Sequence, residues 1–179
     1  MAHVAECVHA IHALPGSVQV ETLVSDAKGS DSLDILLASR PDVFNHNVET
    51  VPRLQRAVRP SAGYARSLSV LARAKAAGLV TKSGLIVGMG ETDDEVVEVL
   101  GDLASIGVDI VTIGQYLRPT SHHLPVARWV EPETFSVYKR DGEARGIGHV
   151  ESSPLTRSSY HAREAAETAV AVPVSIGVR

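Results

Sequence analysis

The sequence predicts an α/β fold in which parallel strands and crossover helices form part of a (β/α) barrel. Short apolar runs rich in β-branched residues alternate with helical patterns about every thirty residues, which is typical of parallel strands joined by right-handed crossovers. One of these repeats carries both a glycine turn and a helix cap. The chain has 179 residues, whereas a closed eight-stranded barrel usually needs about 250. We therefore expect four or five strands that form only part of a barrel.

The strand–helix unit with the clearest sequence pattern lies near the middle of the chain. The apolar run at 85–87 predicts a buried strand, and Gly88 and Gly90 break that run. Thr92 and Glu95 then stand three residues apart, the spacing of a capping box in which each side chain bonds to a backbone amide of the first helical turn. Apolar residues at helical spacing follow. This stretch is predicted to be strand, glycine turn and capped helix.

Similar patterns place the other elements along the chain. Helices are predicted at 3–14, 32–39, 64–77 and 132–145, with a short one after Pro52, and strands at 17–24, 43–44, 109–114 and 149–150. In the first helix Cys7 falls on the apolar stripe, so we expect it in the core. Residues 1–162 should form the partial barrel. Residues 163–179 should form a C-terminal tail that starts helical and is poorly ordered.

The charge, the apolar stretches and the cysteine count of the sequence indicate which binding partners and which cellular compartment to expect. Lys and Arg number 17 against 21 acidic residues, giving a net charge of −4, which argues against binding to nucleic acid or to an anionic membrane surface. No apolar stretch approaches the roughly 20 residues of a membrane span. A single cysteine, Cys7, makes an internal disulfide impossible and favours the reducing cytoplasm. We expect a cytoplasmic protein with no nucleic-acid or membrane partner.

Polar residues follow three of the predicted strands at the point where each ends. They are Asn45, Asn47, Glu49, Glu91, Gln115 and Arg118. The carboxyl ends of parallel strands meet at one rim, so residues far apart in sequence are expected to face one ligand there. The alternative is that loops are polar wherever they begin. Three consecutive strands with an amide or carboxylate beside Gly or Asn favour a site.

Other motifs in the chain carry less information. Gly88 and Gly90 start a dinucleotide fingerprint, but Asp93 stands where its third glycine belongs. The adjacent pair His122 and His123 points in two directions, which favours a solvated loop over a metal site. His3 and Cys7 are better explained as helix surface and helix core than as half of a zinc site.

Several of these segments together resemble a known family. Gly84–Glu91 fits the G-x-I-x-G-x-x-E pattern of radical S-adenosylmethionine (SAM) enzymes. The segments Asn45–Arg53, Gln115–Pro119 and above all Arg157–Ala162 are similar to those of lipoyl synthases, and the resemblance runs from about residue 3 to residue 162 in family order. It implies a partial barrel of the radical SAM, TIM-like type.

The resemblance also implies a chemistry. Lipoyl synthases insert two sulfur atoms into an octanoyl chain carried by a protein lysine, using SAM and two [4Fe–4S] clusters. One cluster cleaves SAM to a radical that abstracts hydrogen, and the other supplies sulfur. The implied partners are an octanoylated lipoyl carrier domain or glycine cleavage H-type protein, and an electron donor such as ferredoxin or flavodoxin. In such enzymes the cofactor carries the chemistry and the protein orients it.

The resemblance assigns roles to particular residues. Asn45, Asn47 and Glu49 would contact the ribose or methionine part of SAM, Gly88 and Glu91 would line the same cofactor, and Gln115 to Leu117 would lie near the adenine. Ser159 would be the catalytic serine that ligates the sulfur-supplying cluster. Arg157 would hold that segment or the substrate lysine region.

The chain departs from the family pattern in its cysteines. The two cysteine triplets that hold the clusters are absent, and Cys7 matches neither. The resemblance therefore implies the C-terminal half to two-thirds of a lipoyl synthase, inactive as it stands. One alternative is a non-catalytic partial barrel that binds only the lipoyl carrier domain. Another is an independent α/β domain that binds a small molecule.

Overall fold

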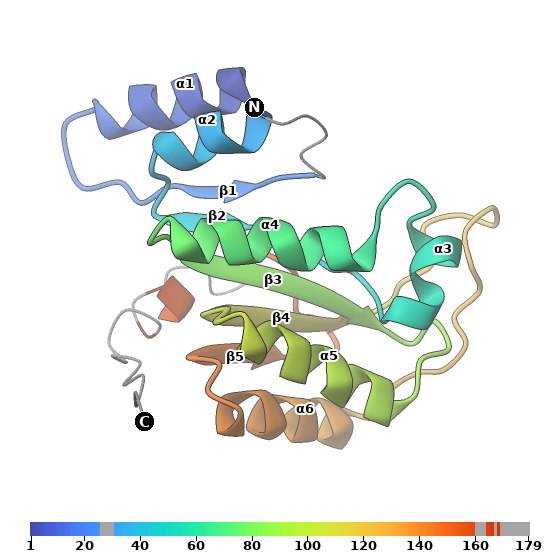
Figure 1. Ribbon diagram of the computed structural model, residues 1–179. Helices are drawn as coiled ribbons and strands as arrows, with labels where there is room; N and C mark the ends of the chain where they lie inside the picture. Colours follow the sequence, from blue (N-terminus) through green and yellow to red (C-terminus); the bar gives the residue numbers. More distant parts are fainter. Residues whose placement is uncertain (26–30, 160–163, 167, 169–179) are drawn as a thin grey trace.

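The protein is described here by a computed structural model, which covers residues 1–25, 31–159, 164–166 and 168. Its centre is a single parallel sheet of five strands in the order β1–β2–β3–β4–β5 (Figure 1). The strands are β1 (Glu21–Leu23), β2 (Val43–Asn45), β3 (Val80–Val87), β4 (Ile110–Gln115) and β5 (His149–Ser152). The predicted α/β architecture with sequential parallel strands is confirmed.

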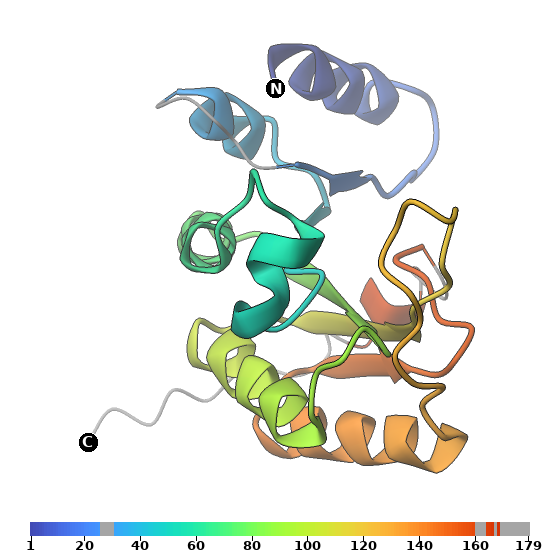
Figure 2. The same cartoon turned by 90° about the vertical axis from the view of Figure 1, so that its right-hand side faces the viewer.

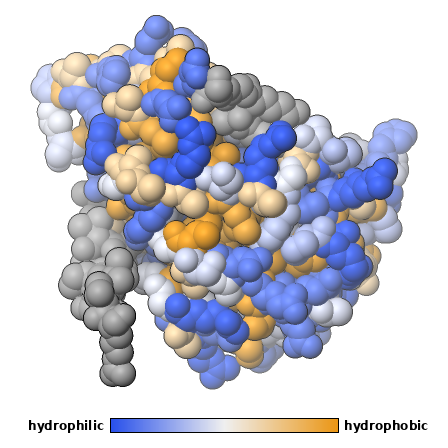
Figure 3. Space-filling model, viewed as in Figure 1, coloured by the Kyte–Doolittle hydropathy of each residue, from blue (hydrophilic) through white to orange (hydrophobic). Residues whose placement is uncertain are grey.

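Helices join the strands and cover one face of the sheet (Figures 1 and 2). They are α1 (Ala2–His12), α2 (Ser32–Ala38), the 3₁₀ turn η1 (Pro52–Leu54), α3 (Gln55–Val58), α4 (Tyr64–Ala76), α5 (Asp93–Ser105) and α6 (Pro132–Ala144). Seen from outside, this helical face mixes hydrophilic side chains with apolar ones that show between them (Figure 3). The segment after β5 returns over the opposite face of the sheet (Figure 2).

Strand β3 shows how side-chain alternation separates the two faces. Leu85 and Val87 pack in the main core with Val96 and Leu100 of α5, all 2% exposed or less. Gly84 and Ile86, at the alternate positions of the strand, line a cavity on the other face. Full burial of a leucine such as Leu100 stabilises the fold by roughly 1.5–3 kcal/mol. The helical face is therefore the hydrophobic core, and the inner face is free for polar groups.

The inner face is built in layers along the strands. At the amino end, Val43 and Ile110 pack against Ala165 and Ala166 of the C-terminal segment. Further along, the fully buried Lys82 donates a hydrogen bond to Glu21 (Nζ–Oε2 2.9 Å). The other oxygen of that carboxylate accepts from the Asn45 amide at 2.7 Å. Beyond this charged layer, at the carboxyl ends of the strands, lies the cavity.

The helix cap predicted for α5 is present in full. The Thr92 hydroxyl accepts from the Glu95 amide at 3.2 Å, and the Glu95 carboxylate accepts from the Thr92 amide at 2.9 Å. Arg53 donates to the same carboxylate, and these hydrogen bonds, from Arg53 first, lower the pKa of Glu95 to about 2. The cap therefore also ties α5 to the chain that follows β2.

Three predictions near the N-terminus were wrong or only partly right. Cys7 is exposed, not in the core, because the buried side of α1 is formed by Ala5 and Val8. The helix ends at His12, so Leu14 is exposed as well. The first strand is limited to Glu21–Leu23, since only that part pairs with β2.

The C-terminal tail falls mostly outside the described residues. Positions 164–166 and 168 are helical, as predicted for the start of the tail. Ala165 and Ala166 are buried, so the described part packs against the sheet. The order expected for the rest of the tail concerns positions outside the described residues. None of the helices described is long and apolar enough to cross a membrane.

Candidate functional site

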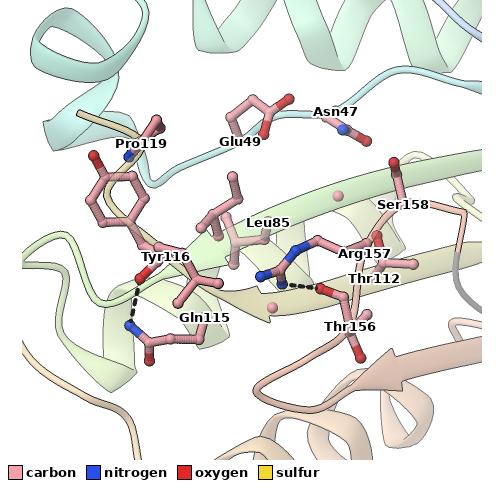
Figure 4. A pocket seen from close by; sticks show the side chains of 14 residues that line it. Asn47, Glu49, Leu85, Thr112, Gln115, Tyr116, Pro119, Thr156, Arg157 and Ser158 are labelled. Carbon is pink, nitrogen blue, oxygen red and sulfur yellow. Dashed lines mark hydrogen bonds between the residues drawn. The ribbon is translucent and has the colours of Figure 1, made fainter. Parts of the chain in front are cut away.

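A cavity of about 390 Å³ opens at the carboxyl ends of β3 and β4 (Figure 4), within the range of small-molecule sites. Four chain segments line it: the turn after β2, the inner face of β3 and β4, the loop after β4 and the segment after β5. The lining residues are Asn47, Glu49, Gly84, Leu85, Ile86, Thr112, Gly114, Gln115, Tyr116, Leu117, Pro119, Thr156, Arg157 and Ser158.

The floor of the cavity depends on two glycines. A Cβ at Gly84 would lie 2.7 Å from the Asn47 side-chain oxygen, and one at Gly114 would lie 2.2 Å from the Thr156 carbonyl oxygen. Both distances are far below van der Waals contact. Between the glycines, Thr112 adds a hydroxyl to the floor. The two glycines therefore let Asn47 and Thr156 approach the strands closely at the floor of the cavity.

One wall comes from the turn after β2, which is fixed to β3 by its backbone. The Glu49 amide donates to Gly84 O and its carbonyl accepts from the Ile86 amide, both at 2.9 Å. This bridge holds Glu49 at φ +67°, a left-handed conformation that costs energy in a non-glycine residue. Such strain persists only where surrounding structure enforces it, and here it directs the carboxylate into the cavity (Figure 4).

Two polar groups on this wall are available to a ligand. Burial raises the pKa of Glu49, although the Asn47 amide and the Arg59 charge act in the opposite direction. The Asn47 side-chain oxygen is buried and has no hydrogen-bond partner within the described part of the chain. A buried acceptor without a partner costs roughly 1–3 kcal/mol, so both groups gain from a ligand that supplies hydrogen-bond donors.

The opposite wall carries a positive charge. Arg157 follows β5, and its guanidinium donates to the Thr156 carbonyl at 2.6 Å (Figure 4). This segment is tied to β4 through the Gln115 amide, which donates to Pro154 O at 3.3 Å. The cavity therefore holds a carboxylate on one wall and a guanidinium on the other, an arrangement that suits a ligand with polar groups of both kinds.

The structure brings together some of the residues predicted for the site and leaves others outside the cavity lining. Asn47, Glu49, Gln115, Leu117 and Arg157 line the cavity, whereas Asn45, Gly88, Glu91 and Ser159 do not. The Asn45 amide bonds to Glu21. The Glu91 carboxylate accepts from the backbone amides of Gly88 and Met89.

Ser159 and Arg118 do not line the cavity. Ser159 is exposed beyond the cavity. Arg118, one of the strand-end residues, donates to the carbonyls of Ser121 and His123 in its own loop. Sequence reasoning missed several small uncharged residues of the lining, such as Gly114, Thr112 and Ser158. Their positions on the inner side of β4 and just beyond β5 were the available signal.

No metal centre is assembled by the described residues, which contain no group of three or more His, Cys, Asp or Glu side chains placed to hold an ion. Cys7 lies exposed on α1, with its sulfur 3.9 Å from the His3 Nε2 atom. His123 bonds to Thr120 within its loop. This agrees with the interpretation of the His122–His123 pair as a loop.

Comparison with known proteins places this geometry in a family. The model of the radical SAM superfamily matches residues 5–103. The lipoyl synthase of Rubrobacter xylanophilus is 55% identical over 159 residues, which cover 87% of this chain and 49% of that protein. The lipoyl synthase of Klebsiella pneumoniae is 52% identical over 164 residues, covering 89% and 51%. The chain thus spans about half the length of these relatives.

Solved structures share the fold at low sequence identity. Streptococcus suis SuiB, and SuiB bound to S-adenosylmethionine, each superpose with a TM-score of 0.67 at 7% identity, covering 87% of this chain and 36% of SuiB. At that identity the likeness concerns the fold alone. Because the family model matches more than half of the sequence, the chain belongs to the radical SAM superfamily, and within it is homologous to the lipoyl synthases.

Proposed function

We propose that this chain supplies the SAM-binding part of a lipoyl synthase, the enzyme that inserts two sulfur atoms into a protein-bound octanoyl chain. The observation that carries the proposal is the cavity at the strand ends. It combines a glycine floor, an amide oxygen with no partner among the described residues, and charges of both signs. The similarity to lipoyl synthases over almost nine-tenths of the chain supports the same assignment.

The residues present fit SAM. Its ribose hydroxyls and ammonium group are hydrogen-bond donors, and the Glu49 carboxylate and Asn47 oxygen are acceptors on one wall. Its carboxylate would lie toward Arg157, which is able to form two parallel hydrogen bonds with such a group. Tyr116 and Leu117 offer apolar surface for the adenine. When bound, SAM supplies the group that abstracts hydrogen from the substrate; the protein binds, orients and shields it.

The residues present do not fit an iron–sulfur cluster. Such clusters are held by several cysteine thiolates, and this sequence contains only Cys7, which is exposed on α1. We derive no step through a cluster on this chain. By resemblance, Ser159 remains a proposed ligand of a cluster held mainly by other residues, and Arg157 a proposed contact to the substrate.

Substrate and partners belong to the same proposal. The substrate would be the octanoyl-lysine of a lipoyl carrier domain or a glycine cleavage H-type protein, and electrons would come from a donor such as ferredoxin or flavodoxin. Arg157 lines the cavity, and Ser159 is exposed two residues further along the same segment. A carrier domain would therefore approach from the strand-end rim.

The cavity's role is tested by closing its floor. In Gly84→Ala the new methyl group would lie 2.7 Å from the Asn47 oxygen. We expect loss of the signal from SAM in ligand-observed NMR, which detects weak binding. The matched control is Gly63→Ala, where the nearest atom is 3.8 Å away and binding should be unchanged.

A second variant separates a closed cavity from a misfolded protein. Gly84→Ala combined with Asn47→Ala removes the two contacts below 3.0 Å and leaves the Thr112 hydroxyl at 3.1 Å. It should recover most of the melting temperature lost in Gly84→Ala but not the affinity for SAM. If Gly84→Ala binds SAM as well as the parent chain does, the ligand lies elsewhere and the proposed function loses its site.

The second candidate is a partial barrel that binds without catalysis, and the single exposed cysteine favours it for the chain by itself. We expect the purified chain to be colourless and free of iron after anaerobic treatment with iron and sulfide, because one thiolate does not hold a cluster. Iron analysis and visible absorption measure this directly. Stoichiometric iron with a cluster absorption band would contradict this expectation and would favour catalysis by this chain without further residues.

A further inference from the structure

One wall of the cavity is a long loop whose position depends on contacts with the rest of the fold. Residues 116–131, which we name the wall segment, run from the end of β4 to the start of α6 and contribute Tyr116, Leu117 and Pro119 to the lining. The segment contains no helix or strand. Its position must therefore be set by contacts with other parts of the fold.

Gln115 makes the most connections to this segment. Its side-chain oxygen accepts from the Val130 amide at 3.0 Å. Its amide nitrogen donates to the carbonyls of Tyr116 (3.1 Å; Figure 4) and Arg128 (3.2 Å). A glutamine amide has two N–H donors, and both are used here. Gln115 is buried, with 5% of its surface exposed. Its hydrogen bonds join both ends of the wall segment and leave no donor for a ligand.

The glycine turn after β3 is the second support. The Ala127 amide donates to Gly88 O at 2.8 Å. Gly88 has φ +102°, and a Cβ there would lie 2.2 Å from the Gln115 amide nitrogen and 2.7 Å from the Arg128 carbonyl oxygen. The Glu91 carboxylate holds this turn by accepting from the amides of Gly88 (2.5 Å) and Met89 (3.0 Å). Glycine is therefore required because the wall segment packs directly on the turn.

A charged cluster gives a third connection. The Arg128 guanidinium donates to the Asp93 carboxylate and, at 3.2 Å, to the Tyr138 hydroxyl. The Tyr138 hydroxyl in turn donates to Asp93 at 2.5 Å. The hydrogen bond from Arg128, followed by that from Tyr138, lowers the pKa of Asp93. The wall segment is thereby joined to the first turn of α5 and to α6.

We propose that Gln115 and the Gly88–Glu91 turn are positioning residues: they hold the wall segment in place, and it is the wall segment that meets the ligand. The inference rests on the proposed function only in taking the cavity as the ligand site. It changes the role that the family resemblance gives to Gly88, Glu91 and Gln115, from direct contacts with the cofactor to supports of the surface that contacts it.

The chain contains its own reporter for this proposal. Its one tryptophan, Trp129, lies between Arg128 and Val130, the two residues that Gln115 holds, and is 67% exposed. Fluorescence anisotropy of Trp129 therefore measures the mobility of the wall segment without a label. Amide hydrogen exchange at Ala127 and Val130 measures the loss of its two supports separately.

The test is Gln115→Met, which keeps the length of the side chain and removes its hydrogen bonds. We expect exchange at Ala127 and Val130 to rise about tenfold or more, and the anisotropy of Trp129 to fall. The matched control is Gln55→Met. Gln55 is also buried, and it bonds to the carbonyls of Val48 and Thr50, so exchange should change there and not in the wall segment.

Both results are obtained without ligand, which separates this inference from the proposed function. If exchange and anisotropy are unchanged in Gln115→Met while affinity for SAM falls, Gln115 contacts the ligand and the inference is overturned. If the wall segment loosens as expected, the inference stands, including in the case where the parent chain gives no SAM signal and only the proposed function fails.

Discussion

Replacing Glu21 with leucine is expected to destabilise the fold by about 3–5 kcal/mol, because it leaves the buried ammonium group of Lys82 without its carboxylate. Lys82 is 0% exposed and lies 2.9 Å from Glu21. The pair joins the short edge strand β1 to β3 across β2. Its loss also removes the acceptor of the Asn45 amide, so three strands are affected by one substitution.

Urea denaturation of three variants tests this explanation. In Glu21→Leu the midpoint should fall steeply. Adding Lys82→Met should recover much of the loss, since an apolar pair often replaces a buried ion pair without cost. The control is Asp34→Ala, which breaks the exposed pair between Arg73 and Asp34 and should have little effect. A loss in Glu21→Leu no larger than that in Asp34→Ala would contradict the importance of the buried pair.

The ion pair also bears on the cavity. Asn45 and Asn47 occupy alternate positions leading out of β2, and Asn45 is held through Glu21. Lys82 precedes Gly84 by two residues on β3 and is on the same side of the strand. The charged layer thus supports the floor of the cavity from below. We expect Glu21→Leu to weaken ligand binding as well. Glu21 does not contact the ligand, and the effect would come from a displaced cavity floor.

The central β3–α5 unit was predictable because its signals are local. The apolar run at 85–87 predicted the strand, and Thr92 with Glu95 predicted the cap that the structure shows. Capping depends on residues three positions apart, so no knowledge of the rest of the fold is needed. The same holds for the helices α4 and α6, whose predicted ranges differ from the observed ones by only one residue at an end.

Features that depend on long-range packing were not predictable in this way. The apolar stripe of α1 includes Cys7, yet which part of the stripe is buried depends on where α2 lies, and Cys7 is exposed. Lys82 is a charged residue three positions before the apolar run at 85–87. Its burial follows from the distant Glu21, which faces it only once β1 and β2 are in place.

The site was predicted in position but only partly in detail. The rule that parallel strands end at one rim located Asn47, Glu49 and Gln115, and these do line one cavity. The rule says nothing about the direction of a side chain. Gln115 lines the cavity but spends both amide donors on the wall segment, and Glu91 bonds to backbone amides of its own turn.

The second large effect is expected at Ser159 in a fused chain. It is made by joining these residues to the N-terminal part of a lipoyl synthase, the part that by resemblance carries both cysteine triplets. Ser158 lines the cavity, whereas Ser159 is exposed beyond it. A group held outside the cavity is therefore reached more easily by Ser159. The competing explanation is that both serines cap a following helix, a common role for serine that is worth about 0.5–2 kcal/mol.

The two explanations predict different patterns of activity and stability. If Ser159 is a ligand, Ser159→Ala should abolish formation of the lipoyl group while cleavage of SAM to 5′-deoxyadenosine stays measurable. Ser158→Ala should do far less to lipoyl formation. Capping instead predicts that either substitution lowers the melting temperature, with similar residual lipoylation in both. Mass spectrometry of the carrier protein and chromatography of 5′-deoxyadenosine give the two activities, and equal lipoylation in the two variants would remove Ser159 from the site.

Replacement by cysteine separates ligation from any indirect effect of the serine. A thiolate is a softer ligand than an alkoxide and is the usual ligand of iron–sulfur clusters. In the fused chain, Ser159→Cys should therefore retain the full iron content of the protein. It should nevertheless form the lipoyl group poorly if the serine is there because it is easily displaced. Ser158→Cys, one residue away and facing the cavity, should change neither iron content nor its stability to chelators. A Ser159→Cys protein that lipoylates at the parent rate would show that ready displacement of this ligand is not needed for sulfur transfer.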